Sequence, residues 1–294
     1  MKKILITSIL SLFFTLLLAQ ETYVYSDPDN YYYEGKELFN QRKFTASIRS
    51  FEAYLESKKN TRTDWQQEAE FFLLANAYEL RQADVAKNLV AYLNKYPFST
   101  FSSRAAFMLG MLSCESRKYK TALNWFNQVS ESQLPKENRS EFLFNKGYAH
   151  IENKEFGKAQ AIFKNLVGKN TRYEISATYY YAYTEYALRN YDNALKLFLS
   201  LENNPEYAKF VPYYIVQIYY YKKEYEKLHP YAEKILKGNP NSPNNAEIYR
   251  ILGEYYYRNK DYKKAIENLR KYESGVKKVG RNDMYLLGIS YYNT

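Results

Sequence analysis

Apolar residues recur along most of the chain with the spacing of paired amphipathic helices. In residues 106–129, AFMLGMLSCESRKYKTALNWFNQV, apolar side chains recur every three or four residues on both sides of the polar segment ESRK. This spacing places the apolar side chains on one face of each helix. The pattern therefore predicts two helices joined by a short turn, and ENKE, LRN and RNKD predict similar turns further along the chain.

The same arrangement recurs along the chain. The second helix of a unit carries an alanine and then a large residue four positions later, such as Ala122 and Phe126 or Ala159 and Phe163. One position in each first helix, small in all units but one, marks a repeat of 34 to 40 residues: Gly35, Ala75, Gly110, Gly147, Ala182, Val216, Gly253 and Gly288. One helix pair cannot bury its apolar face alone, so we expect the units to stack.

Two units depart from the common pattern. The second unit, around residues 73–93, has Asp84 where other units have an aromatic residue, and the sixth has Val216 and Leu228 in its two small-residue positions. Proline and asparagine residues separate the units and predict breaks between helices. These breaks lie at Tyr96-Pro97, Pro135, Asn204-Pro205 and residues 239–243.

The period, the small first-helix residue, the alanine and the aromatic positions resemble the tetratricopeptide repeat (TPR) superfamily over residues 28–294. The resemblance implies an all-α, right-handed superhelical solenoid of about seven helix-turn-helix units plus a final unpaired helix. That helix lies within NDMYLLGISYYNT, residues 282–294, and carries apolar side chains with no second helix after it. We expect the natural protein to continue beyond Thr294; the alternative is that this end docks a partner.

Three positions of the first helix typically face a concave groove in TPR proteins: the fifth, the ninth and the twelfth, counting the small residue as the eighth. The resemblance places a mostly aromatic set there: Tyr32, Phe72, Phe107, Phe144, Tyr148, Tyr179, Tyr183, Tyr186, Tyr213, Tyr220 and Tyr257. Independently, the spacing of Tyr179, Tyr183 and Tyr186 puts them on one stripe of a helix. An exposed aromatic strip suggests a partner, and tyrosine offers it a rigid surface with a polar end. The alternative is that these rings cover one another across neighbouring first helices.

The first twenty residues have the layout of a secretory signal peptide. Lys2 and Lys3 precede an apolar run from Ile4 to Ala19, which is shorter than the roughly 20 residues of a membrane-spanning helix. We expect residues 1–19 to be removed, residues 20–27 to form a short extension, and the mature chain to be exported to the periplasm or the outer membrane without integral membrane segments. No cysteine stands at the cleavage site, which disfavours a lipid anchor.

The start of the chain and the segment YPFS, residues 96–99, resemble those of bacterial envelope TPR proteins, such as outer-membrane-assembly lipoproteins and Tol/Pal-associated proteins. The missing cysteine argues against the first group. The formal net charge is +10, and basic side chains on the convex turns would favour an anionic surface, although plain solvated helix faces are the alternative. Basic residues fall mainly on second helices and turns while aromatic residues line first helices, so we expect no nucleic-acid partner.

Residue types that carry catalysis or bind metals are sparse. His150 and His229 lie in different units without metal-ligand spacing, and Cys114 lies inside an apolar segment. No glycine-rich phosphate loop is present. The sequence therefore predicts a non-enzymatic protein without cofactor or metal, a cell-envelope scaffold that binds a peptide or a partner helix. Glycan binding, with sugars stacked on the groove tyrosines, is the alternative.

Overall fold

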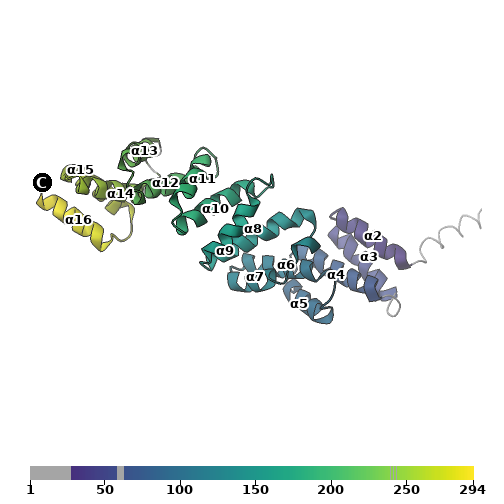
Figure 1. The fold of residues 1–294 in the computed structure, drawn as a ribbon. Helices are drawn as coiled ribbons and strands as arrows, with labels where there is room; N and C mark the ends of the chain where they lie inside the picture. Colours follow the sequence, from purple (N-terminus) through teal and green to yellow (C-terminus); the bar gives the residue numbers. More distant parts are fainter. Residues whose placement is uncertain (1–27, 58–62, 239, 241, 243) are drawn as a thin grey trace, which may run out of the picture. The chain divides into compact units, whose positions relative to one another are not determined.

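The computed structural model describes residues 28–57, 63–238, 240, 242 and 244–294, and its regular elements there are all helical (Figure 1). The predicted signal peptide lies outside these residues. The first seven helices are α2 (Pro28–Asn40), α3 (Phe44–Ser57), α4 (Thr63–Glu79), α5 (Val85–Lys95), α6 (Ser102–Glu115), α7 (Tyr119–Phe126) and α8 (Lys136–Glu152). They are followed by α9 (Phe156–Leu166), α10 (Glu174–Ala187), α11 (Tyr191–Ser200), α12 (Val211–Tyr221), α13 (Tyr225–Gly238), α14 (Asn245–Arg258), α15 (Tyr262–Gly275) and α16 (Arg281–Tyr292).

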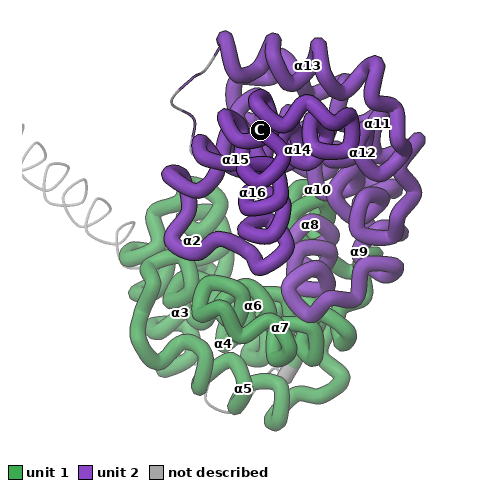
Figure 2. Tube along the Cα trace, turned by 90° about the vertical axis from the view of Figure 1, so that its left-hand side faces the viewer, with its two compact units in different colours: residues 1–142 green, residues 143–294 purple. Residues whose placement is uncertain are grey.

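The chain divides into two compact units, which we call unit 1 (Met1–Phe142) and unit 2 (Leu143–Thr294), and the division falls within α8 (Figure 2). In unit 1, α2 packs on α3, α3 on α4 and α6 on α7. In unit 2, α9 packs on α10, α10 on α11 and α14 on α15. Each helix thus contacts its neighbours in sequence, as the predicted stack of helix pairs requires, and the predicted all-α repeat fold is confirmed.

The small residue of the first helix lets a large side chain of the second helix approach its backbone. A Cβ atom added to Gly35 would lie 2.9 Å from the ring of Phe51, and one added to Gly147 would lie 2.8 Å from the ring of Phe163. Real Cβ contacts are not this short, so an alanine would displace the ring. The marker of the sequence repeat is therefore the contact point of each helix pair. Gly288 in α16 has open space at this point.

The turn inside each described helix pair ends the first helix in the same way. A lysine or arginine has a positive φ between 55° and 63° in each: Arg42, Arg81, Arg117, Lys154, Arg189, Lys223 and Lys260. The next amide then bonds back to the helix, as when Lys118 N donates to Ser113 O at 2.8 Å. This closure is usually made by glycine, and a cation at a helix C-terminus is favoured by the helix dipole.

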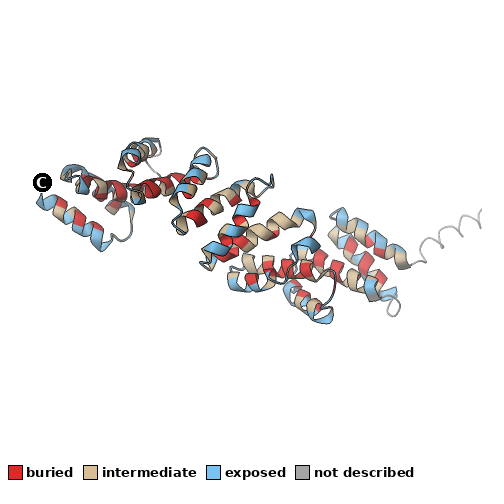
Figure 3. Ribbon diagram, viewed as in Figure 1, coloured by how far each residue is buried: buried red, intermediate tan, exposed pale blue. Residues whose placement is uncertain are grey.

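Buried positions follow the faces where neighbouring helices meet (Figure 3). The four turns that the sequence predicted lie where expected, between α6 and α7, α8 and α9, α10 and α11, and α14 and α15. In the sixth pair, Val216 of α12 and Leu228 of α13 are both fully buried. None of the helices in the described residues is long and apolar enough to cross a membrane.

Candidate partner-binding surface

The structure buries the predicted groove residues of unit 1. Tyr32, Phe72 and Phe107 are only 3%, 7% and 6% exposed. Tyr32 stacks on Trp65 with ring centroids 4.6 Å apart, and Phe72 stacks on Phe51 at 5.4 Å. Other aromatic rings cover these side chains, which corrects their predicted place on an accessible strip. They belong to the core of unit 1 because aromatic residues of neighbouring helices close over them.

The corresponding residues of unit 2 are half-buried, so each keeps part of its ring accessible. They come from the first helices of consecutive pairs, α8, α10, α12 and α14. We call these residues the tyrosine stripe: Phe144, Tyr148, Tyr179, Tyr183, Tyr186, Tyr213, Tyr220 and Tyr257.

Tyr214, which the sequence analysis did not single out, supports the middle of the tyrosine stripe. Its ring stacks on Phe198 with centroids 4.8 Å apart. It also meets the rings of Tyr183 and Tyr186 edge-on at 6.0 and 5.3 Å. One signal in the sequence could have identified it, because Tyr214 and Tyr180 both lie two residues before the residue that marks the repeat in their helix, Val216 and Ala182. Tyr180 likewise stacks on Phe163 of the preceding helix pair. The ring contacts of Tyr214 orient the stripe residues around it.

Hydroxyl groups of the tyrosine stripe are joined through Gln217, the ninth-position residue of α12. Tyr186 donates to Gln217 Oε1, and Gln217 Nε2 donates to the hydroxyl of Tyr213 at 2.7 Å. Burial raises the pKa of Tyr186 and of Tyr213 above the ordinary value for a phenol. Both phenols therefore stay neutral, and their hydroxyl groups form hydrogen bonds with Gln217.

An ion-pair cluster continues along the first helices beyond Tyr213. Arg250 lies 2.6 Å from Glu247, 3.6 Å from Glu254 and 3.7 Å from Asp283. Burial alone would lower the pKa of Arg250, but the three carboxylates more than offset it and the pKa rises. Glu254 also binds Arg258 at 2.7 Å. The charges of Arg250 and Glu254 are thus satisfied within unit 2.

The candidate reactive residues are held in structural contacts. His150 is buried, and its Nδ1 lies 2.6 Å from Glu155 Oε2. Burial raises the pKa of the Cys114 thiol to about 11, with a smaller contribution from Glu115. A thiol with this pKa is a poor nucleophile. In the described part of the chain, no group of three or more His, Cys, Asp or Glu residues could hold a metal ion.

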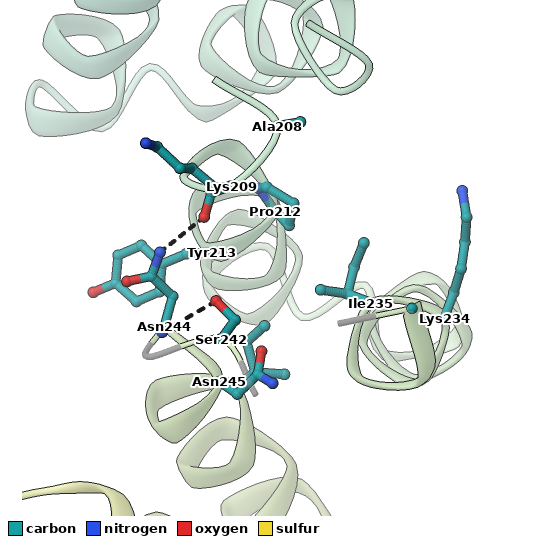
Figure 4. Close-up of a pocket in the computed structure, with 11 residues that line it drawn as sticks. Ala208, Lys209, Pro212, Tyr213, Lys234, Ile235, Ser242, Asn244 and Asn245 are labelled. Atoms are coloured by element: carbon teal, nitrogen blue, oxygen red, sulfur yellow. Dashed lines mark hydrogen bonds between the residues drawn. The ribbon is translucent and has the colours of Figure 1, made fainter. Parts of the chain in front are cut away.

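The described residues of unit 2 line cavities, of which two are large enough to hold a small ligand. One, of about 280 Å³, has Pro212, Tyr213 and Ile235 among its lining residues (Figure 4). The other, of about 320 Å³, is lined partly by Tyr249 and Tyr256 and by three lysines. All three lysines are paired with nearby acidic residues: Lys271 with Glu267 at 2.8 Å, Lys264 with Asp261 at 3.5 Å, and Lys237 with Glu233 at 3.9 Å.

Comparison with known proteins places both family matches in unit 2. Residues 144–208 match a model described as tetratricopeptide repeat, and residues 221–294 match one described as anaphase-promoting complex, cyclosome, subunit 3. The search of curated proteins found no match.

Solved structures of similar fold include two bacterial repeat proteins. The C-terminal part of a TPR repeat-containing protein from Cytophaga hutchinsonii is 17% identical, with a TM-score of 0.54, and the match covers 87% of this chain and 99% of that chain. A tetratricopeptide repeat protein from Parabacteroides merdae is 14% identical, with a TM-score of 0.46, and the match covers 90% of this chain and 98% of that chain.

The fold defines an all-α helical repeat protein. The two family matches, over residues 144–208 and 221–294, together with this fold support the tetratricopeptide repeat superfamily. Repeats of this kind generally mediate protein–protein interactions, and folds built from them are typically non-enzymatic.

Proposed function

We propose that this chain is a non-enzymatic scaffold that holds a protein partner, as an extended peptide or a helix, against the tyrosine stripe of unit 2. The observation that carries the proposal is the half-burial of the stripe. Neighbouring rings hold Tyr148, Tyr183 and Tyr186 in place while part of each ring stays accessible. Side chains already fixed in position lose little conformational entropy when a partner covers them.

The proposed setting is the bacterial cell envelope. The signal-peptide layout of residues 1–19 and the envelope-like YPFS segment support export to the periplasm or the outer membrane. Lysine and arginine residues in the turns of the helix pairs are exposed. We propose that they add contact with an anionic surface, since such contacts steer association even where each is weak.

Site-specific photocrosslinking tests whether the tyrosine stripe is the face that contacts the partner. A benzophenone amino acid in place of Tyr183 should give a discrete protein adduct in intact cells. The same group at Lys196, an exposed position on α11, serves as the control and should not give it. Adducts of equal yield at both positions would contradict a partner-binding stripe.

The identified partner then allows an affinity test. The double substitution Tyr148→Ser and Tyr183→Ser should weaken binding at least about tenfold, or roughly 1.4 kcal/mol. The matched control is Tyr33→Ser, because Tyr33 is an exposed tyrosine of unit 1 outside the stripe. Binding by the double variant at the level of the control would refute the proposal.

A peptide array and a glycan array, probed with the full chain, separate the two ligand classes. We expect capture of peptides with aromatic or apolar side chains that depends on Tyr183. Sugar capture that depends on Tyr183 would replace the protein-binding proposal with the glycan-binding one.

A further inference from the structure

In unit 2, aromatic rings close the first two junctions between consecutive helix pairs. Tyr173, directly before α10, stacks on Phe144 with centroids 4.8 Å apart. Tyr207, shortly before α12, stacks on Tyr179 at 4.6 Å. The leucine near the end of the intervening second helix is buried at both junctions, Leu166 at the first and Leu201 at the second.

Among the described residues of the third junction there is no such ring. Tyr173, Tyr207 and Asn244 each lie nine residues before the marker residue of their helix, so Asn244 takes the position of the two tyrosines. The Asn244 side chain instead donates from Nδ2 to Lys209 O at 2.8 Å. Ile235 corresponds in position to the two buried leucines but is only half-buried.

A cavity occupies the place of the missing ring. Tyr213, the counterpart of Tyr179, lies with Asn244 on one side of the view and Ile235 on the other, with Pro212 between them (Figure 4). The cavity volume is about 280 Å³. Apolar cavities of about 150 Å³ admit benzene, and sites for drug-sized ligands begin near 300 Å³. The space therefore suits one substituted aromatic ring.

We propose that this cavity takes an aromatic side chain of the bound protein partner, which stacks on Tyr213 as Tyr207 stacks on Tyr179. The assignment of this ring to a protein partner rests on the proposed protein-binding function. Tyr213 also belongs to the tyrosine stripe and is joined through Gln217 to Tyr186. A partner segment that lies along the stripe thus reaches the cavity without leaving the same face of α12.

The lining favours an uncharged ring over a cationic group. Pro212, Ile235 and Ile248 supply apolar walls, and none of the described lining residues is acidic, so a cation would find no carboxylate there. Lys209 and Lys234 also line the cavity. The ammonium group of Lys209 lies over the Phe210 ring at 4.8 Å and that of Lys234 lies 3.4 Å from Glu202. Stacking on Tyr213 is therefore the contact that distinguishes a ring from an aliphatic side chain of similar size.

A fluorinated amino-acid amide tests the cavity without a known partner. Fluorine NMR of N-acetyl-4-fluorophenylalanine amide with the full chain should show line broadening that N-acetyltyrosine amide reverses. N-acetylleucine amide and methyl glucoside should compete at least about tenfold less well. Equal competition by the leucine amide would show an apolar cavity without preference for a ring and would overturn the proposal.

Two substitutions at Asn244 make a matched pair. Asn244→Tyr restores the ring of the earlier junctions, so it should abolish the broadening and raise the melting temperature. Asn244→Ala removes the same amide without adding a ring and should keep the broadening. Unchanged broadening with Asn244→Tyr would overturn the proposal. A lower melting temperature for Asn244→Tyr would do the same, because it would show that a segment of this chain already occupies the cavity.

The reverse change opens a second site. Tyr207→Asn removes the ring that covers Tyr179 and should raise the number of bound probe molecules from one to two, with circular dichroism as the check of folding. A folded Tyr207→Asn variant that still binds one probe would contradict the proposal. If this variant does not fold, the comparison of Asn244→Tyr with Asn244→Ala tests the cavity proposal by itself.

Loss of partner affinity in the Tyr148 and Tyr183 double variant with intact probe binding supports the stripe function separately from the cavity. Unchanged partner affinity in that double variant, with probe binding that Asn244→Tyr abolishes, would refute the stripe function and leave the cavity as a site for aromatic rings.

Discussion

The two units place aromatic residues at the same positions of their first helices and use them differently. In unit 1, Tyr32 and Phe72 are enclosed by rings from neighbouring helices and are almost inaccessible. In unit 2, Tyr183 and Tyr186 pack by their ring edges and remain half-exposed. Phenylalanine stabilises a fold only through burial, whereas tyrosine has a polar end that suits a partly wet position. An aromatic position in the repeat thus builds core in one unit and surface in the other.

The largest contrast should come from truncating one ring in each unit. Phe72→Ala should cost about 3–5 kcal/mol of unfolding free energy, because it leaves a cavity in a closed core. Tyr183→Ala should cost about 1–2 kcal/mol, because less area leaves contact with the protein. Both of the chain's tryptophans, Trp65 and Trp125, lie in unit 1. Denaturant unfolding followed by tryptophan fluorescence therefore reports unit 1, and circular dichroism reports both units. Equal losses would show that the stripe is core as well.

A second contrast uses two glycines at the same repeat position. Gly35→Ala should destabilise unit 1 by about 1–3 kcal/mol, because the new methyl group would lie 2.9 Å from the Phe51 ring. Gly288→Ala meets open space and should stabilise α16 by up to about 1 kcal/mol through helix propensity. Thermal unfolding measures both changes. A loss of stability with Gly288→Ala would mean that another segment covers this face.

A smaller effect isolates the hydroxyl contacts of the stripe. Tyr186→Phe keeps the ring and removes the hydrogen bond to Gln217, which should cost about 0.5–1.5 kcal/mol. Tyr285→Phe is the matched control, because Tyr285 is 61% exposed and should lose almost nothing. Chemical denaturation of the two variants side by side gives the difference. If the two losses are the same, the hydroxyl of Tyr186 does not order the stripe.

The smallest effect is a pH dependence confined to unit 2. Burial lowers the pKa of His150, the Glu155 contact opposes this, and Lys158 and Lys146 lower it further. A depressed pKa means that the unfolded chain binds the proton more readily, so stability is complete above the ordinary histidine pKa and is lost as the pH falls. Acidification from about pH 7.5 to 5.5 should therefore lower the unfolding midpoint seen by circular dichroism. His150→Gln should reduce this change.

Unit 1 supplies the internal control for the pH experiment. The chain's two histidines, His150 and His229, both lie in unit 2. The transition reported by tryptophan fluorescence should accordingly stay constant over the same pH range. A parallel shift of both signals would mean that the effect does not arise from a histidine of unit 2.

The fold could be predicted almost entirely because its signals are local. The turn at Arg117 and the contact of Gly35 with Phe51 follow from residues less than one repeat apart. The candidate surface could be predicted only in part, because exposure depends on side chains that arrive from the next unit. Tyr179 and Tyr213 occupy the same repeat position, and the difference between them is a ring at Tyr207 and an amide at Asn244. The pairing of Arg250 with Asp283 was also missed, since it joins two consecutive first helices, α14 and α16.

The sequence by itself determined the repeat, the helix pairs, their turns and the small residues at which the helices meet. Helical periodicity and steric size act over a few residues, and both can be read from the order of the amino acids. Only the tertiary structure decided which aromatic rings are core and which are surface. It also decided where a ring is absent beside Tyr213. Burial is a property of the side chains around a residue, and in this fold those side chains lie about one repeat away along the chain.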